Sequence, residues 1–357
     1  MFMMEDPTGG RESLVMIMGE DVMHGLLRLG VAWVLLLPWT TAAAVLVFVG
    51  VWVGKRLTAA KCTSSRRMDG KTVIITGGES GLGKEVAKDL VDRGADVIIA
   101  GINKNKAYET RDELAAKEGT VEVAYLDVSS MASVRRFAKT MEGRKIDVLL
   151  NNAGVADLPR RITNEGLEFT VATNHLGHFL LTHLLMPGLK EARGKVITVA
   201  SICHKRAKHE EDLDLKGDLR FCYEREVGML EIYGATKAMN ILFSSELSRR
   251  LKGTGVTSNC LNPGSSKTDI FNNLTNSHWY GPFIKLYVLA YAKTITEGAQ
   301  TSIHVAVSEG VDGVSGKYFE DCKEAEPSEL VQDEGIARKL WEISERLVQL
   351  QPHEKTI

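Results

Sequence analysis

The sequence predicts an α/β fold: a doubly wound parallel sheet in one domain, preceded by a single N-terminal transmembrane helix. From Gly70 onward, short apolar runs alternate with amphipathic stretches, a pattern typical of parallel strands with helices on both faces. A glycine-rich turn follows the first of these runs. Nearer the N-terminus, residues 29–54 carry no charge.

The composition excludes several classes of protein. The chain has 357 residues, of which 44% are apolar and 25% charged, so a disordered chain is not expected. Lys and Arg number 44 against 46 Asp and Glu, and this balance gives no reason to expect nucleic acid as a partner. Five cysteines without a C-x-x-C pair argue against a disulfide framework or a cysteine-rich zinc site, and favour a reducing compartment.

The first element is a membrane anchor at residues 26–54, after a polar segment at residues 1–25. Its uncharged stretch is long enough to cross a hydrocarbon core of about 30 Å, and membrane helices tolerate a proline such as Pro38. A cleaved signal peptide is the alternative, but its leading region should be basic and its apolar core shorter. Here the leader carries several acidic residues.

The segment after the anchor, residues 55–69, is predicted to be a basic linker. It holds Lys55, Arg56, Lys61, Arg66 and Arg67 before its first acidic residue. Positive charge on this flank places the rest of the chain, including the catalytic domain, in the cytosol.

Residues 70–350 are predicted to form the sheet and its helices, followed by a tail at 351–357. The expected strands are short and several are rich in β-branched residues. They span residues 72–76, 96–100, 122–127, 147–151, 195–200 and 256–262, and the expected helices between them include 83–93, 104–118, 131–141, 164–186 and 233–251. Residues 336–350 place their aliphatic side chains on one stripe, which predicts a helix docked on the domain, with a helix on the membrane surface as the alternative.

The turn after the first strand, residues 76–83, reads TGGESGLG. Glycines let the backbone turn sharply and let a diphosphate approach the N-terminus of the next helix. Turn glycines without a ligand are the alternative. Two further strand ends favour a nucleotide, because ligands of open parallel sheets bind outside the carboxyl ends of the strands. Asp127 is expected to end the third strand, where its carboxylate can accept a bond from an adenine amino group, and NNAG at 151–154 to end the fourth.

Tyr233 and Lys237 are the candidate catalytic pair, at the start of a long predicted helix. A spacing of four residues puts them on one face, where an ammonium group would lower the pKa of the phenol towards neutrality for proton exchange. Ser201, after the fifth strand, can hydrogen-bond a substrate oxygen. An ordinary helix face and an ordinary turn serine are the alternatives.

Asn174 lies in an apolar helical run, where an asparagine is unfavourable unless its side chain is used. It is a candidate to hold a proton-relay water, provided the fold brings it to Lys237. The neighbouring His175, His178 and His183 lack a metal-binding pattern. We therefore expect no metal, and histidines used in packing and hydrogen bonding.

Taken together, these motifs resemble the short-chain dehydrogenase/reductases, and within them the membrane-anchored retinol dehydrogenase-like group. The resemblance covers about residues 68–350. It rests on TGGESGLG at 76–83, LDV at 126–128, NNAG at 151–154, NHLGHFLLT at 174–182, Ser201, YGATK at 233–237 and NPG at 262–264, with GKYFEDCKEAEPS at 316–328 and ARKLWEISERL at 337–347 pointing to the subgroup.

The resemblance implies a Rossmann-type, NAD(P)-binding domain and a catalytic tetrad of Asn174, Ser201, Tyr233 and Lys237. Tyr233 would be the general acid/base and Lys237 would hold the nicotinamide ribose. The implied cofactor-binding residues are Thr76, Gly77, Ser80, Gly81, Leu82, Gly83, Asp127, Val128, Asn151, Ala153, Gly154, Tyr233, Lys237, Pro263, Gly264 and Thr268.

The choice of cofactor depends on the end of the second strand. NAD-preferring relatives have an acid at the position of Gly101, and NADP-preferring relatives often have Arg at the position of Ile102. This chain has neither. Since Lys84 and Lys104 supply positive charge and no acid is expected to repel a phosphate here, NADP(H) is predicted to be preferred, with NAD(H) as the alternative.

The substrate side is expected at residues 265–296, which are rich in aromatic and aliphatic residues and suit either a lipophilic ligand or a pair of core helices. A polar insert at 210–228, between Ser201 and Tyr233, is longer than is usual in the group. The predicted function is oxidation or reduction of a retinoid-like alcohol or aldehyde at a membrane, with the endoplasmic reticulum expected. A steroid or fatty-aldehyde enzyme, a non-catalytic nucleotide-binding scaffold and a homo-oligomer remain alternatives.

Overall fold

The strands form where β-branched and aliphatic residues run together. The computed structural model describes residues 59–115, 117–156, 160–221, 228–264 and 292–357, together with Leu46, Gly50 and Gly54. Five strands lie within one residue of their predicted positions, because buried runs such as TVIIT and DVIIAG favour extended backbone. These are β1 (Thr72–Thr76), β2 (Asp96–Gly101), β4 (Val148–Asn151), β5 (Lys195–Val199) and β6 (Thr257–Asn262).

The sheet has eight strands in the order β3-β2-β1-β4-β5-β6-β7-β8. All pairs are parallel except the last, in which β8 (Lys323–Ala325) runs antiparallel to β7 (Tyr318–Glu320). The chain leaves β1 on one side to reach β2 and β3, and returns across it to β4. This reversal of strand order beside β1 is where ligands bind in sheets of this type.

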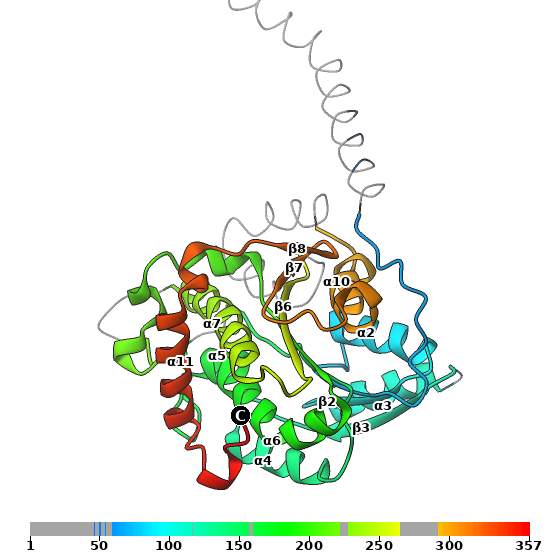
Figure 1. Cartoon of the computed structure of the whole chain (residues 1–357), viewed down its shortest axis with the longest axis horizontal. Helices are drawn as coiled ribbons and strands as arrows, with labels where there is room; N and C mark the ends of the chain where they lie inside the picture. The colour runs from blue at the N-terminus through cyan, green and yellow to red at the C-terminus, as the bar shows by residue number, and fades with distance from the viewer. Residues whose placement is uncertain are drawn as a thin grey trace, which may run out of the picture. The chain divides into compact units, whose positions relative to one another are not determined.

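Helices cover both faces of the sheet, as predicted (Figure 1). Alternate residues of β1 enter two separate cores: Val73 and Ile75 face one, and Ile74 faces the other. The first core lies under α2 (Gly81–Asp92), α3 (Lys104–Leu114) and α10 (Ile295–Val307), and the second under α4 (Met131–Thr140), α6 (Gly177–Ala192), α7 (Met229–Arg250) and α11 (Glu334–Leu347).

Several predicted boundaries are wrong. The third strand is β3 (Thr120–Tyr125), two residues earlier than predicted, so Asp127 follows the strand and does not end it. Helix α3 ends at Leu114, short of the predicted residue 118. The long helix starts at Met229, so Tyr233 lies in its second turn and does not open it.

The predicted helix at 164–186 is three elements. A short α5 (Phe169–Val171) leads into one π-helical turn, η1 (Ala172–Leu176), and then into α6. Residues 164–168 lie outside the helix, and Ile162 and Glu168 form an isolated bridge. The helix also continues through Pro187 to Ala192. A π turn inserts an extra residue and is common near functional sites, but the 3.6-residue pattern does not reveal it.

The C-terminal helix α11 packs on the domain, as predicted. Its residues Ile336, Leu340 and Trp341 are buried in the second core with Phe179 and Phe243 of the neighbouring helices. The strands β7 and β8 were not among the predicted elements. Each has three residues, too few to show an alternating pattern.

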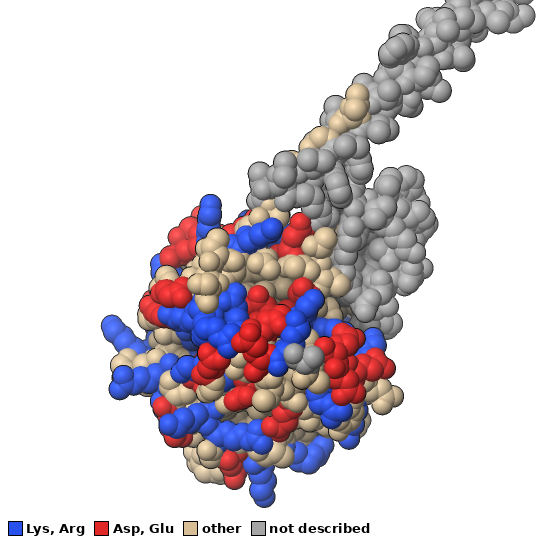
Figure 2. Space-filling view, turned by 90° about the vertical axis from the view of Figure 1, so that its right-hand side faces the viewer, with Lys and Arg blue, Asp and Glu red and all other residues tan. Residues whose placement is uncertain are grey.

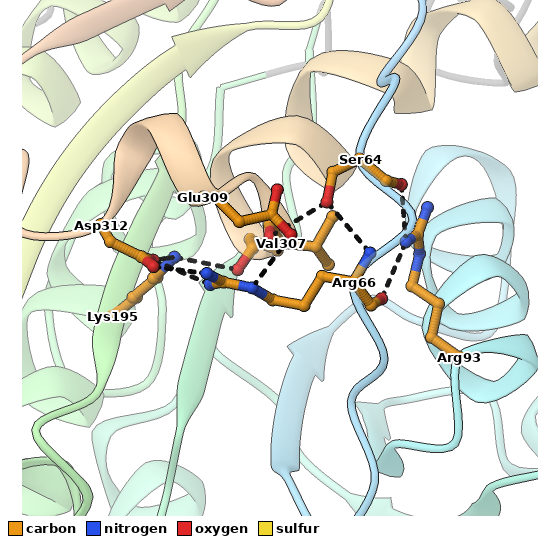
Figure 3. Close-up of polar contacts among 8 residues, drawn as sticks. Ser64, Arg66, Arg93, Lys195, Val307, Glu309 and Asp312 are labelled. Atoms are coloured by element: carbon orange, nitrogen blue, oxygen red, sulfur yellow. Dashed lines mark hydrogen bonds and ion pairs between the residues drawn. The ribbon is translucent and has the colours of Figure 1, made fainter.

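The segment just before β1 is docked on the domain. Arg66 donates to both carboxylate oxygens of Asp312 at 2.9 and 2.5 Å, and Lys195 donates to the same carboxylate at 3.0 Å. Arg93 donates to the carbonyls of Ser64 and Arg66, both at 2.9 Å (Figure 3). We call residues 60–70 the N-terminal strap. The part of the predicted linker inside it is held in place by these bonds and by buried Met68.

The chain divides into two units, Met1–Ala59 and Ala60–Ile357. The predicted anchor belongs to the first unit and lies outside the described residues apart from Leu46, Gly50 and Gly54. Within the described ranges, every helix is too short or too polar to cross a bilayer. On the face of the second unit shown in Figure 2, basic and acidic side chains are intermingled.

Candidate active site

The glycine-rich turn joins β1 to α2 with a close approach of backbone to backbone. Gly77 has φ +67°, a conformation that favours glycine. A Cβ added at Gly83 would lie 2.4 Å from the carbonyl oxygen of Gly77 and 2.7 Å from Nδ2 of Asn152, so this position admits no side chain. The N-cap residue Ser80 makes no side-chain capping bond. The first turn of α2 can therefore offer its N–H groups to an anion.

Thr76 fixes the neighbouring turn after β4. Its buried hydroxyl oxygen accepts hydrogen bonds from the backbone N–H groups of Asn152 and Ala153, both at 2.9 Å. The same oxygen lies 2.9 Å from Nε2 of His178. The Asn152 side chain donates to the carbonyl oxygen of Thr76 at 2.9 Å. Thr76 thus holds two strand ends together, and it does not line the cavity between them.

A cavity of about 380 Å³ lies at the carboxyl ends of β1, β2 and β4. Of the predicted cofactor-binding residues, it is lined by Gly77, Ser80, Gly81, Leu82, Asp127, Val128, Ala153 and Gly154. Gly83 and Asn151 pack behind it: Nδ2 of buried Asn151 donates to Thr182 Oγ1 at 3.2 Å. The glycine cradle and the uncapped helix end suit the diphosphate of a dinucleotide.

Asp127 lies at the cavity wall although it follows the strand. One of its oxygens, Oδ1, accepts bonds from the N–H and the hydroxyl group of Ser129, at 2.9 and 2.7 Å. These bonds fix the carboxylate beside Val128, where an amino group of a bound base could reach it.

The π turn buries Asn174 and uses its whole amide. Oδ1 accepts from the N–H of Val155 at 2.8 Å, and Nδ2 donates to the carbonyl of Val155 at 2.9 Å and to Oγ1 of Thr236 at 3.0 Å. Thr236 belongs to α7 and lies between Tyr233 and Lys237 in the sequence. The asparagine side chain thus joins the π turn to Val155 and to α7, and its role in holding a relay water stays a prediction.

Asn174 and Lys237 do come together, as the proton-relay hypothesis requires. A Cβ added at Gly154 would lie 3.3 Å from Oδ1 of Asn174 and 3.4 Å from Nζ of Lys237. Gly154 also lines the cavity, so both side chains lie next to its wall.

Tyr233, Lys237 and Ser201 meet at the start of α7. Nζ of Lys237 donates to the carbonyl oxygen of Val199 at 3.1 Å and lies 5.5 Å from the centre of the Tyr233 ring. Ser201 is hydrogen-bonded to Tyr233 through its side chain. The Ser201 hydroxyl also accepts from the N–H of Cys203 at 3.2 Å, so this serine is a helix cap as well as a neighbour of the phenol.

The pKa values in this group are set mainly by burial. Burial raises the pKa of Tyr233 above its usual range, Cys203 adds to this, and the bond from Ser201 opposes it. Burial also lowers the pKa of Lys237 to about 8. The sequence predicted a lowered pKa for Tyr233. In this structure the phenol is 4% exposed, and removal from water raises its pKa.

The NPG turn after β6 lies at the same edge of the sheet. Gly264 has φ +79° and donates its N–H to Oδ1 of Asn262 at 3.0 Å, while Lys293 donates to the carbonyl of Pro263 at 3.3 Å. The last predicted cofactor residue, Thr268, lies outside the described residues, as does most of the predicted substrate segment at 265–296.

The three histidines make packing and hydrogen-bonding contacts. His175 lies 2.9 Å from the hydroxyl of Ser344, and His183 packs against Phe179 and Trp341. His178 bonds Thr76, as described above. Among the described residues, no group of three potential metal ligands comes together.

Sequence reasoning missed some cavity residues. Glu79, Asn152, Ser129, Phe169 and Thr173 all line the cavity. Asn152 stood inside a recognised motif. Phe169 and Thr173 were assigned to the interior of a helix, and the π turn that brings their segment to the cavity has no sequence signal. Glu79 stood unremarked in the glycine-rich turn.

The fold and this site define an NAD(P)-dependent oxidoreductase. The short chain dehydrogenase family profile matches residues 71–210. The chain is 39% identical to human retinol dehydrogenase 14, over 87% of this chain and 98% of that protein, and 37% identical to human retinol dehydrogenase 11, over 82% and 90%. The chain therefore belongs to the short-chain dehydrogenase/reductase family.

Solved structures agree with this assignment. An uncharacterised protein from Mycobacterium paratuberculosis is 30% identical, with a TM-score of 0.64 over 82% of this chain and 98% of that one. L-sorbose reductase from Gluconobacter frateurii, solved with NADPH and L-sorbose, is 20% identical, with a TM-score of 0.57 over 71% and 95%. At that identity the second comparison shows the fold alone.

Proposed function

We propose that the protein transfers a hydride between a nicotinamide cofactor and a lipophilic alcohol or aldehyde of the retinoid type. The observation that carries this proposal is the meeting of Tyr233, Lys237 and Ser201 beside a cavity built for a dinucleotide. The retinoid class is supported by relatives named retinol dehydrogenases at 36–41% identity over most of the chain.

Each group of cavity residues would bind a different part of the cofactor. The first turn of α2 at Ser80–Leu82 would bind the diphosphate through its N–H groups. Asp127 and Val128 would hold the adenine, and Ala153 and Gly154 would lie along the ribose and nicotinamide. Pro263, Gly264 and Thr268 are proposed to border the nicotinamide, as the resemblance implies. The bound cofactor supplies or accepts the hydride.

We assign to Tyr233 the transfer of the proton to or from the substrate oxygen. Its phenol would donate to the carbonyl oxygen of an aldehyde during reduction, and would accept from the alcohol during oxidation. Ser201 would hold the same substrate oxygen. Lys237, with a pKa of about 8, retains most of its charge near neutral pH, where it would hydrogen-bond the ribose and would favour the phenolate against the effect of burial. Asn174 is proposed to hold the relay water, and its amide bonds to Val155 and Thr236 would fix that part of the path.

We also keep the proposal that residues 26–54 anchor the protein in a membrane, with the catalytic domain in the cytosol and the endoplasmic reticulum as the expected site. It is supported by the uncharged stretch at 29–54 and the basic residues after it. An anchor would place the enzyme where lipophilic substrates dissolve. Binding of a lipophilic substrate at residues 265–296 stays a prediction from sequence.

The NADP(H) preference predicted from the sequence rests on two assumptions about charge. It assumed that two lysines could meet a 2′-phosphate and that no acid lay near Gly101. In the structure, Lys84 pairs with Glu113 at 2.7 Å and Lys104 lies over the ring of Tyr125. The glycine-rich turn also brings an acid, Glu79, to Gly101. The second assumption is therefore wrong.

Replacement of Tyr233 tests the function. We expect Tyr233→Phe, made in the full chain in membranes, to lower turnover by about 10²- to 10⁴-fold and to leave nucleotide binding nearly unchanged. Retinal, steroid ketones and aliphatic aldehydes should each be offered with NADH and with NADPH. A preference for a steroid or a fatty aldehyde would contradict the retinoid class.

The control is Tyr318→Phe. Tyr318 is also a buried tyrosine, but it lies on β7, outside the residues that line the cavity. This variant should keep full turnover. Equal activity of Tyr233→Phe and the unchanged protein would contradict the assigned acid/base. Nucleotide binding without turnover of any substrate would favour the non-catalytic scaffold.

A further inference from the structure

The carboxylate of Glu79 occupies the space in which a side chain at position 101 would begin. A Cβ added at Gly101 would lie 2.1 Å from Oε2 of Glu79 and 2.3 Å from both Cδ and Oε1. Glu79 comes from the glycine-rich turn, and Gly101 ends β2. Position 101 thus has no acidic side chain of its own, and Glu79 brings a carboxylate to the same place from another element.

This carboxylate is buried and lacks a full set of partners. Glu79 is 9% exposed, and within the described residues its Oε2 has no hydrogen-bond partner. An ionised carboxylate taken out of water without donors is strongly unfavourable. A ligand that carries hydroxyl donors would remove this penalty.

The surroundings identify which part of a dinucleotide would lie here. Glu79, Gly101 and Ile102 line the same cavity as the diphosphate turn at Ser80–Leu82 and the adenine wall at Asp127. The adenosine ribose joins those two groups, so it must pass the end of β2. An acid after the second strand of such folds accepts hydrogen bonds from the ribose hydroxyls.

The 2′-phosphate of NADP(H) needs cationic partners, and this part of the cavity offers it a carboxylate instead. It would bring a second anion to a buried carboxylate. The two nearby cations predicted to meet it are engaged, Lys84 with Glu113 at 2.7 Å and Lys104 over the Tyr125 ring with its Nζ 5.3 Å from the ring centre.

We infer that Glu79 is the residue that selects the cofactor: its carboxylate accepts hydrogen bonds from the 2′- and 3′-hydroxyls of the adenosine ribose and favours NAD(H) over NADP(H). The inference rests on the proposed nucleotide site and deepens it. It also reverses the preference predicted from Gly101 and Ile102, because the acid is supplied from the turn after β1 and not from β2.

The test is equilibrium binding to the full-length protein, measured by calorimetry and by nicotinamide fluorescence without substrate. We expect NADH to bind more tightly than NADPH, and 5′-AMP more tightly than 2′,5′-ADP. Glu79→Gln removes the charge at nearly constant volume. It should lower the NADH/NADPH affinity ratio by about 10- to 100-fold, the usual contribution of hydrogen bonds to a charged group.

Two further variants sharpen the test. Glu85→Gln removes a negative charge from α2, the helix that follows the turn of Glu79. Glu85 lies outside the cavity lining and accepts a bond from Thr296 at 2.9 Å, so this variant should leave the ratio unchanged. The double variant Glu79→Ser with Gly101→Asp moves the acid back to the end of β2. It should restore the preference for NADH that Glu79→Ser alone has lost.

The outcomes separate this inference from the proposed function. Tighter binding of NADPH by the unchanged protein, or an unchanged ratio in Glu79→Gln, would overturn the role of Glu79 and leave the oxidoreductase assignment intact. Failure to bind either nucleotide would contradict the nucleotide site itself, and with it both proposals.

Discussion

Thr76 shows how strongly this site depends on one hydroxyl group. Its oxygen accepts from two consecutive backbone N–H groups, at Asn152 and Ala153, and lies next to His178. The threonine and His178 are buried and the two N–H groups are part-buried, so a residue of the same shape without the hydroxyl would leave these donors without their acceptor.

We expect Thr76→Val to lower the free energy of unfolding by about 1–3 kcal/mol, because the substitution leaves two part-buried N–H donors without their acceptor. The turn at 152–154 should also loosen, which would weaken nucleotide binding. Urea unfolding and calorimetry measure the two effects. Thr76→Ser keeps the hydroxyl and should lose much less stability. If the valine variant were as stable as the serine variant, the hydroxyl would not hold the turn.

Single residues also mark the limit of sequence reasoning at this site. Asn174 could be singled out because an asparagine in an apolar helix is unusual, and its amide is indeed fully used. Glu79 could not be, because its importance depends on Gly101, which the fold brings against it from a different strand. A residue type that is unusual for its own element can be recognised in a sequence, whereas a contact between elements cannot.

Among the elements, the sequence predicts the strands with buried apolar runs correctly, but it does not predict the π turn or the shortest strands. β1 and β2 follow from their β-branched, buried residues. The π turn at Ala172–Leu176 and the three-residue strands β7 and β8 are set by tertiary contacts. Their local sequences carry no distinct periodicity.

The N-terminal strap yields a prediction about an element. Arg66 holds the pKa of Asp312 at about 2, with further contributions from Lys195. The neutral substitution Asp312→Asn weakens the contacts of this side chain with Arg66 and Lys195. Because the Asp312 side chain is about half exposed, we expect the free energy of unfolding to fall by only about 0.5–1 kcal/mol. The strap should then open locally, which limited trypsin digestion with mass spectrometry would detect as faster cleavage after Arg66 and Arg67.

The control for the strap is Glu191→Gln, which removes an exposed ion pair with Lys145 at 3.5 Å. It should leave the cleavage rate at Arg66 and Arg67 unchanged. Equal cleavage of Asp312→Asn and the unchanged protein would show that these ion pairs do not hold the strap.

The molecule as a whole has two cores, one on each face of the sheet, and three buried histidines of η1 and α6 pack in the second core. Burial lowers the pKa of His175 to about 3 and the pKa values of His178 and His183 to about 4. The unfolded chain, with histidine pKa values near 6.5, therefore binds more protons than the folded one between pH 6.5 and 4. The contribution of these histidines to stability is therefore fully present above pH 6.5 and is lost as the pH drops through this range.

For each of these histidines, we predict that the free energy of unfolding falls by at most about 1.4 kcal/mol per unit decrease in pH. Urea unfolding at pH 7, 6 and 5 measures this change. His183 packs against Phe179 and Trp341, and within the described residues its ring nitrogens have no hydrogen-bond partner. His183→Phe should therefore flatten the pH dependence, whereas replacement of the exposed His353 by Phe should not. A slope that is the same in all three proteins would contradict this account.

The strap also sets the smallest version of the domain that can be prepared intact. A truncation that begins at β1 would keep every strand and helix of the sheet. It would nevertheless remove Arg66 from Asp312, leave Arg93 without two acceptors and uncover the surface on which Met68 is packed. Shortened forms should accordingly start no later than Ala60, ten residues ahead of the first turn of the sheet domain at Gly70.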